Sequence, residues 1–418
     1  MTRQARDEQV LEYLDAMAEE MLDLLSASVR CASESGWEDR VAEVYATWFA
    51  GRGMPVTRQP IASSGFAAGE PRASERENVI AWYPGRTGRS VVVLNGHLDV
   101  VPAGDPSAWS LPPYSGLRKA GRVHGRGSVD MKGGIAAGLY ALAALSALQI
   151  DLGFDIAMEL VVAEETTGVG TRAAEAVVPH PAAALVLEPS GGAIVPVSTG
   201  LLFFTVEVTG KAAHTSAPWR GVDAFERLIW LREALAEHAR KRGERYTHPL
   251  FAAVPTALPF AVGTASAGTW RAAVPDRAVM SGRLGVAPGE SLDAVRQEFQ
   301  HVVDEVAAAD EWLRAHPPTL RWDHEGLPGW ETPLDDPLIV ALVSAQRDFS
   351  GSESLIGFTA GSDAAFFGAR GIPTAVFGPG EVSLAHGPDE YVSERDVVDA
   401  AKVLALALLR MEVNGRER

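Results

Sequence analysis

The sequence predicts an α/β protein into which a smaller α+β domain is inserted. Up to about residue 195, short apolar runs, glycine-flanked loops and helical periodicities alternate, which is typical of a doubly wound, mostly parallel sheet flanked by helices. From Leu201 to Thr209 the residues LLFFTVEVT alternate like a half-exposed antiparallel strand. The first pattern resumes at about residue 336. We therefore expect an outer α/β domain built from both ends of the chain.

The elements of the first half follow from periodicity and turn residues. Apolar residues at three- and four-residue spacing predict helices at 8–30, 38–51 and 131–148. Apolar runs predict strands at 77–83, 91–99, 154–163 and 183–187. The stretch 61–74, rich in Gly, Ser and Ala, is expected to be a loop, and the proline-rich stretch 105–114 is expected to be irregular.

The elements of the second half define the insertion. For the inserted domain we expect strands at 201–209, 279–286 and 319–322, and helices at 221–242 and 290–308. After it come a helix from about 336, the apolar run 374–377 and a last helix at 394–411. The predicted boundaries are 1–196 and 328–418 for the outer domain and 197–327 for the insert.

Charge and cysteine content exclude several partners and sites. The formal net charge of −17 argues against nucleic acid or an anionic membrane as a partner, because both require a basic face. The single cysteine, Cys31, excludes an internal disulfide and a cysteine metal cluster. The start of the chain lacks a signal-peptide core, and no run of about 18 apolar residues occurs. We expect a cytoplasmic protein whose metal sites would use His and carboxylates.

The stretch from Val91 to Asp99, VVVLNGHLD, is the centre of the predicted site. Its apolar, β-branched run indicates a buried strand of a parallel sheet. In open α/β sheets, ligands bind beyond the carboxyl ends of such strands. His97 and Asp99 therefore lie where chemistry is expected.

Other acid and imidazole residues follow apolar runs or lie in glycine-bearing loops: Asp130, Glu164, Glu165, Glu188 and His386. Each alone has an ordinary structural interpretation; Asp130, for example, precedes a helix and would be worth about 1 kcal/mol as its N-cap. Together they predict a site, because the carboxyl ends of parallel strands share one edge. Two imidazoles and several carboxylates suit one or two zinc-like ions.

The number of carboxylates also fits a two-metal site with one bridging ligand. Asp130 would be the bridge, Glu165 and Glu188 terminal ligands, and Glu164 a base. Asp99 would then support His97 from outside the ligand set, as carboxylates commonly do for ligating histidines.

Ordered segments along the chain resemble the signatures of one enzyme family. They are HLDVVP at 97–102, GRGSVDMKGG at 125–134, EET at 164–166, EP at 188–189, GKAAHTSAP at 210–218, GSDAAFF at 361–367 and AHGPDEYV at 385–392. They are similar to those of the dizinc metallopeptidase family of acetylornithine deacetylase, succinyl-diaminopimelate desuccinylase, aminoacylase and glutamate carboxypeptidase. The resemblance extends from about residue 8 to 411.

The resemblance implies a zinc-peptidase-like catalytic domain with an inserted ferredoxin-like domain for dimerisation and lid formation. It implies that His97 and Glu188 bind one zinc, that Glu165 and His386 bind the second, and that Asp130 bridges both. Glu164 would be the general base, with Asp99 supporting His97. His214, in the GKAAHTSAP segment, would reach the active site of the partner subunit of a homodimer.

The implied reaction is hydrolysis of the amide bond of N-acylated amino acids by a metal-bridging water, with cobalt or manganese as alternatives to zinc. Arg283 matches an arginine that the family uses for a substrate carboxylate, and Gly361 and Ser362 match further substrate contacts. Ala272 departs from the family, which commonly has asparagine there. A carboxypeptidase or dipeptidase is the alternative activity, and a non-catalytic member of the fold is a third possibility.

Overall fold

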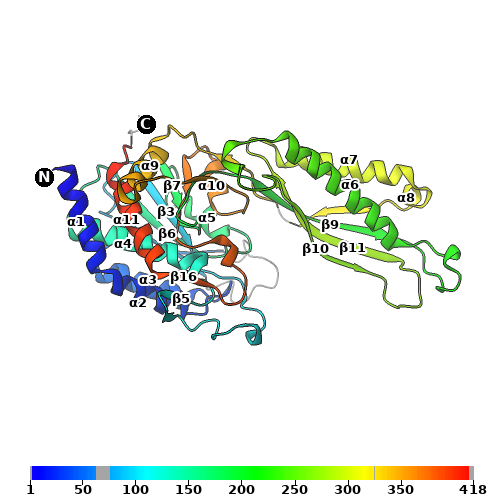
Figure 1. Cartoon of the computed structure of the whole chain (residues 1–418), viewed down its shortest axis with the longest axis horizontal. Helices are drawn as coiled ribbons and strands as arrows, with labels where there is room; N and C mark the ends of the chain where they lie inside the picture. Colours follow the sequence, from blue (N-terminus) through cyan, green and yellow to red (C-terminus); the bar gives the residue numbers. More distant parts are fainter. Residues whose placement is uncertain (1, 63–75, 324, 414–418) are drawn as a thin grey trace. The chain divides into compact units, whose positions relative to one another are not determined.

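The computed structural model describes residues 2–62, 76–323 and 325–413 (Figure 1). These residues form two compact units. The first comprises Met1–Pro196, Thr332–Ile356 and Ser362–Arg418, and the second comprises Val197–Glu331 and Gly357–Gly361. The second unit thus includes residues 328–331 and 357–361, which the sequence analysis assigned to the outer domain. The loop expected at 61–74 falls largely outside the described residues.

The first unit is built around a mixed sheet whose centre is parallel. Its strands are β1 (Val56–Pro60), β2 (Glu77–Tyr83), β3 (Val91–His97), β6 (Asp155–Val161), β7 (Ala183–Val186), β8 (Ile194–Ser198), β14 (Leu355–Phe358) and β15 (Thr374–Val376). The order is β1-β2-β6-β3-β7-β15-β8, with β14 also paired to β8, and β13 (Trp330–Glu331) pairs with the end of β8. Strands β6, β3, β7 and β15 are parallel to their neighbours in this group. The predicted mostly parallel sheet is confirmed.

Helices flank this sheet. They are α1 (Arg3–Ala16), α2 (Ala18–Val29), α3 (Asp39–Gly51), α4 (Gly133–Ala147), α5 (Val169–Ala174), α9 (Pro337–Ser350), α10 (Ala364–Ala369) and α11 (Glu394–Arg410). The single helix expected at 8–30 is instead two helices, because Met17 (φ −96°, ψ 3°) leaves the helical conformation and ends α1. Within the described ranges, no helix has the length and apolarity needed to cross a bilayer.

Strand β3 and helix α4 approach each other closely because small residues line their contact. All residues of β3 after Val91 are buried, as its β-branched run predicts. A Cβ atom on Gly96 would lie 2.8 Å from Cγ1 of Ile135, and one on Gly134 would lie 1.9 Å from the carbonyl oxygen of Leu187. Glycine at these positions therefore allows α4 to pack against the ends of β3 and β7.

The first unit also contains a small, separate antiparallel sheet. It contains β4 (Leu117–Lys119), β5 (Arg122–His124) and β16 (Tyr391–Ser393), in the order β16-β5-β4. These strands are not predicted from the sequence, because three residues are too few for a detectable period. Their pairing joins two segments that are far apart in the sequence.

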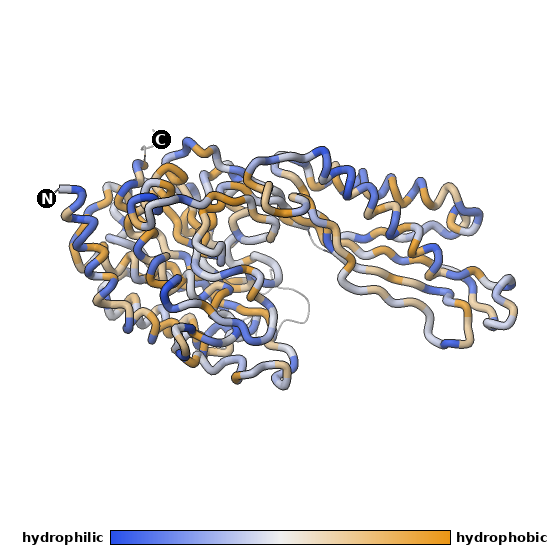
Figure 2. The backbone as a smooth tube through the Cα atoms, viewed as in Figure 1, coloured by the Kyte–Doolittle hydropathy of each residue, from blue (hydrophilic) through white to orange (hydrophobic). Residues whose placement is uncertain are grey.

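The second unit is a βαββαβ arrangement of the ferredoxin-like type. Its elements are β9 (Gly200–Thr209), α6 (Ala224–Arg245), β10 (Phe260–Ala267), β11 (Arg277–Val286), α7 (Leu292–Ala309), α8 (Glu311–Ala315) and β12 (Thr319–Trp322). The antiparallel sheet has the order β10-β11-β9-β12. Helices α6 and α7 lie side by side (Figure 1) and share one apolar core with the strands. Figure 2 shows hydrophilic residues along both helices, as expected for their outer faces.

Candidate metal centre

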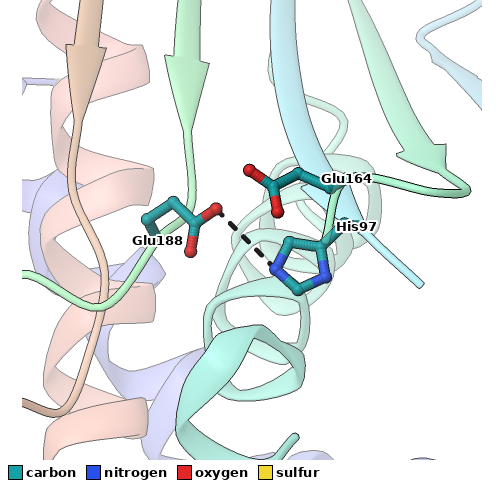
Figure 3. Close-up of side chains that lie close together, drawn as sticks. All are labelled: His97, Glu164 and Glu188. Atoms are coloured by element: carbon teal, nitrogen blue, oxygen red, sulfur yellow. Dashed lines mark ion pairs between the residues drawn. The ribbon is translucent and has the colours of Figure 1, made fainter. Parts of the chain in front are cut away.

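The ends of three parallel neighbours bring the first group of acid and imidazole residues together. His97 is the last residue of β3, Glu164 follows β6, and Glu188 follows β7. Figure 3 shows the three side chains converging, with Nε2 of His97 3.7 Å from Oε1 of Glu188. One ligand atom from each of the three lies within 4.8 Å of the others. The edge of the sheet thus presents an imidazole and two carboxylates to one point.

Asp130 connects this group to a second histidine. It lies in the turn Ser128–Lys132 that precedes α4. Its Oδ1 is 3.0 Å from Nε2 of His97, and its Oδ2 is 3.2 Å from Nε2 of His386. The same nitrogen of His386 is 3.2 Å from Oε2 of Glu165. Two imidazoles therefore face the two oxygens of one carboxylate, and each also has a further carboxylate nearby.

This donor set is suited to divalent cations. Zn²⁺ takes imidazole nitrogen and carboxylate oxygen as ligands, usually four of them. His97, Asp130 and Glu165 also have ligand atoms within 4.8 Å of one another. The residues could hold two ions that share Asp130, a type of site that clamps both the attacking and the leaving group in hydrolysis.

Backbone conformations at two points of the cluster are unusual. Ala163 and His386 both adopt φ of 62°, in the left-handed region that residues with a Cβ rarely occupy. Each such residue costs roughly 1–3 kcal/mol and persists only where its surroundings hold it. Ala163 directly precedes Glu164 and Glu165, so the turn presents both carboxyl groups to the cluster.

The close packing of these ionisable side chains shifts their pKa values. Burial opposes the charged form of His97, but the charges of Glu188 and Asp130 outweigh it and raise its pKa well above the usual value. Hydrogen bonds to Asp130 and Glu165 raise the pKa of His386 to about 10. Burial, with the negative charge of Asp130, raises the pKa of Glu188 well above its ordinary range. The cluster therefore stabilises added positive charge.

The pKa of Glu164 is raised as well, mainly by the same cause as that of Glu188. Burial is the main cause that raises its pKa well above the ordinary value, and the nearby charges of Asp363 and Glu188 add to it, whereas His97 opposes the shift. A buried carboxyl group with a strongly shifted pKa is typical of functional sites.

Asp99 lies beside His97, as expected, and its carboxylate makes its hydrogen bonds to other residues. Nδ1 of His97 is 2.8 Å from the main-chain oxygen of Asp99. The same nitrogen is 3.9 Å from Oδ1 of the Asp99 carboxylate, beyond hydrogen-bond distance. The carboxylate instead accepts hydrogen bonds from the backbone N–H groups of Glu164 and Glu165 and from Oγ of Ser35. The main chain thus orients the imidazole, and the Asp99 side chain holds the Glu164–Glu165 turn.

Several buried polar residues near the cluster were not singled out by the sequence analysis. Asp363 accepts a hydrogen bond from Oγ1 of Thr171, and burial raises its pKa to about 7. Lys132 is fully buried and donates to main-chain carbonyls. Glu390 and Arg126 form a buried ion pair. All four lie inside the signature segments, which was the available signal, but their roles depend on tertiary contacts.

The remaining predicted site residues lie outside the cluster. His214 is exposed in the second unit, where its Nδ1 is 2.8 Å from Oγ of Ser216. Arg283, also in the second unit, donates from Nη2 to the main-chain oxygen of Thr359, and burial lowers its pKa. Gly361 closes that unit's second segment. Ser362 is buried in the first unit, and its Oγ has no hydrogen-bond partner among the described residues. The functions of these four residues stay predictions.

Comparison with known proteins identifies the family to which the chain belongs. The model of peptidase family M20/M25/M40 matches residues 93–410, which is more than half of the chain and includes the cluster from His97 to His386. The chain belongs to peptidase family M20/M25/M40. It is therefore a metallohydrolase acting on amide bonds, and the predicted family resemblance is confirmed.

Relatives of this M20 peptidase include deacylases and peptidases. It is 27% identical over 352 residues to an N-formyl-4-amino-5-aminomethyl-2-methylpyrimidine deformylase of Halalkalibacterium halodurans, covering 78% of this chain and 81% of the relative. It is 28% identical over 394 residues to a probable carboxypeptidase of Talaromyces marneffei, covering 91% and 83%. It is 26% identical over 352 residues to a probable succinyl-diaminopimelate desuccinylase of Staphylococcus aureus, covering 77% and 83%.

Solved structures share the fold of this M20 peptidase. A di-peptidase from Saccharomyces cerevisiae has a TM-score of 0.78 at 12% identity, with 97% of this chain and 98% of that chain covered. A dinuclear metal binding peptidase of the M20 family from Bacillus subtilis has a TM-score of 0.66 at 16% identity, with 96% and 100% covered. Both likenesses show the fold, within which the residues described above form the cluster.

Proposed function

We propose that this protein hydrolyses the amide bond of N-acylated amino acids, using two divalent cations. The observation that carries the proposal is the position of Asp130, whose two carboxylate oxygens face Nε2 of His97 and Nε2 of His386. One cation would be held by His97, Asp130 and Glu188, and the other by Asp130, Glu165 and His386. We propose zinc for both, with cobalt or manganese as alternatives.

When bound, the two cations supply Lewis acidity and lower the pKa of water from 15.7 toward about 7. Glu164 then takes the proton of the attacking water and later donates a proton to the departing amine. This role is supported by the position of the Glu164 carboxyl group beside His97 and Glu188 and by the backbone hydrogen bond from Glu164 to Asp99, which fixes the turn. A general base in this position contributes about 10²–10⁴-fold to the rate.

We assign substrate recognition to Arg283 in strand β11 and to the segment around residue 361. The guanidinium of Arg283 is suited to bidentate binding of the substrate carboxylate. Ser362, together with Gly361, would contact the acyl-amino group, a role supported by the unpartnered, buried hydroxyl of Ser362 among the described residues. His214 of a second subunit would stabilise the developing oxyanion. Ala272, which lacks a polar side chain, is expected to alter the acyl preference.

A homodimer, required by this role of His214, is part of the proposal. Its interface would lie on the second unit, where Trp219 and Trp270 are 78% and 67% exposed. The edge strand β10, FAVGTASA, is largely exposed and carries no charged residue that would prevent pairing with another strand. Light scattering should give twice the monomer mass, and a monomer would contradict the proposal. We also propose a cytoplasmic location, which the single cysteine supports.

A carboxypeptidase or dipeptidase activity is the second candidate. It is favoured by the probable carboxypeptidase relative, whose alignment covers 91% of this chain. The bond chemistry is the same in both cases, so the substrate pocket alone distinguishes the two activities.

The zinc-loaded protein should be assayed against N-formyl, N-acetyl and N-succinyl amino acids and against dipeptides with the same C-terminal residues. The proposal predicts higher kcat/KM for at least one N-acyl series. A consistent preference for dipeptides would favour the second candidate. If neither series is hydrolysed with zinc, cobalt or manganese, the proposed function is wrong. Glu164→Gln serves as the inactive control.

A further inference from the structure

Two segments that carry proposed metal ligands are paired through their backbones. Strand β5 precedes the segment that contains Asp130, and strand β16 follows the segment that contains His386. The two strands are antiparallel neighbours, with Tyr391 opposite His124. The backbone N–H of Gly125 also donates to the main-chain oxygen of Glu390 at 2.8 Å. Residues 125 and 390 thus mark the point where both segments leave the small sheet and turn toward the cluster.

The side chain of Glu390 extends this connection to Asp130 and Arg126. The carboxylate of Glu390 is 1% exposed and accepts hydrogen bonds with both of its oxygens. Its Oε1 accepts from the backbone N–H groups of Val129 and Asp130, at 3.0 and 3.3 Å. Its Oε2 accepts from Nη1 of Arg126 at 2.5 Å. Glu390 therefore fixes the backbone of the residue that would bridge both cations.

Arg126 extends the same network to the second histidine. Its Nη2 donates to the main-chain oxygen of His386 at 3.1 Å, while Nη1 binds Glu390. The residue is 2% exposed, and its guanidinium lies 5.3 Å from the ring centre of Trp109. One guanidinium thus holds His386, whose φ of 62° requires such support, and the carboxylate that holds Asp130.

The other proposed cation site is supported by different elements. His97 is the last residue of β3, and Glu188 follows the neighbouring strand β7. Nδ1 of His97 bonds to the main-chain oxygen of Asp99. Neither residue has a hydrogen bond to Arg126 or Glu390 among the described residues. Asp130 is shared by both sites, whereas His386 belongs to one, so loss of the support that Arg126 gives His386 should weaken the His386 site more than the other.

We propose that Arg126 and Glu390 are positioning residues for the cation held by Asp130, Glu165 and His386. A buried ion pair adds little stability compared with apolar packing, because both charges lose their hydration. Its value here is geometric: the fork of the guanidinium and the two carboxylate oxygens fix His386 and Asp130 relative to each other. This inference rests on the proposed function, since it assumes that the cluster binds two cations.

Two variants separate positioning from general stability. Glu390→Gln keeps one acceptor oxygen but turns an amide N–H₂ toward Nη1 of Arg126. Arg126→Lys keeps the positive charge, but a single ammonium group cannot reproduce both arms of the guanidinium. The matched control is Glu394→Gln, which removes a carboxylate four positions along the chain. Glu394 pairs with Arg118 at 2.8 Å and has no bond to the ligand segments among the described contacts.

The test is calorimetric titration of each metal-free protein with Zn²⁺ alone, with circular dichroism to establish folding. For both variants we expect the ion beside His386 to bind about 10–100-fold more weakly, whereas the ion beside His97, which shares only Asp130 with the disturbed segments, is weakened less. Glu394→Gln should match the wild type. If Glu390→Gln fails to fold, Arg126→Lys decides the question.

The inference is overturned if a folded variant binds both ions as the wild type does, or if both ions are weakened equally. Equal weakening would indicate a purely structural ion pair. Failure of the proposed function gives a different result, because the wild type itself would then bind fewer than two ions per chain.

Discussion

The carboxylate of Asp99 accepts a hydrogen bond from the backbone N–H of Glu164, with 3.1 Å between Oδ1 and the nitrogen. The other oxygen accepts from the next residue, Glu165, at 3.3 Å. Asp99 is fully buried two residues beyond the end of β3. The side chain therefore fixes the turn after the neighbouring strand β6, so one strand end determines the position of the proposed base and of a proposed ligand.

Asp99→Asn should loosen the Glu164–Glu165 turn without removing a proposed metal ligand. The amide can accept one of the two backbone hydrogen bonds but presents N–H₂ to the other. We expect kcat to fall by about 10–100-fold, as for other groups that orient a metal site, with two ions still bound. Ser35→Ala is the matched control, since it removes one hydrogen bond to Asp99, worth about 1 kcal/mol. Wild-type kcat in the asparagine variant would contradict this role.

Glu164→Gln should abolish turnover while leaving metal binding intact. We expect kcat to fall by about 10²–10⁴-fold, because the amide cannot accept the proton of water. The neighbouring variant Glu165→Gln should instead weaken the binding of one ion, because its carboxylate lies beside His386. Kinetics and metal content measured on both proteins test the division of roles. Loss of metal from Glu164→Gln would show that the two assignments must be exchanged.

Gly134→Ala should destabilise the first unit. The new methyl group would lie 1.9 Å from the main-chain oxygen of Leu187, so α4 or the segment that leads to Glu188 must shift. Overpacking of this kind costs about 1–3 kcal/mol in the free energy of unfolding. Gly51→Ala is the control, since its methyl group meets nothing within 4 Å and should add roughly 0.4–1 kcal/mol. Urea unfolding that ranks the two variants in the opposite order would refute the packing argument.

Glu159 should make stability depend on pH. Burial raises its folded-state pKa from 4.5 to about 8, while Asn95 donates a hydrogen bond that opposes the shift and the charges of Asp363 and Arg370 act in opposite directions. Between these two pKa values the unfolded chain is ionised and the folded chain is protonated, so this contribution to stability is lost as the pH rises.

We therefore expect the free energy of unfolding of the wild type to fall relative to that of Glu159→Gln by up to about 1.4 kcal/mol per pH unit between pH 5 and 8. Denaturant unfolding of both proteins at pH 6 and pH 8 measures this difference. Parallel pH profiles would mean that Glu159 titrates normally in the folded protein.

Much of the cluster could be predicted from sequence because parallel strands impose a simple geometry. An apolar run followed by His97, and further runs followed by Glu164 and Glu188, need only be neighbours in a parallel sheet for their ends to meet. Strands β6, β3 and β7 are such neighbours. The inserted α+β unit could likewise be predicted, because β9 alternates and α6 and α7 are amphipathic.

The remaining features depend on contacts that leave no period in the sequence. The main-chain oxygen of Asp99 lies 2.8 Å from Nδ1 of His97, and spacing alone cannot distinguish this contact from one made by the carboxylate. Strand β10 was missed because FAVGTASA is an exposed edge strand of small residues without an apolar alternation. The pairing of Arg126 with Glu390 joins positions 264 residues apart, and only the tertiary fold reveals it.

The measurement that tests the central claim most directly is the number of Zn²⁺ ions bound per chain by metal-free wild-type protein, determined by calorimetric titration and checked by elemental analysis. We expect two ions, because Asp130 places one carboxylate oxygen beside each imidazole. Saturation at one ion, or no binding, would contradict it.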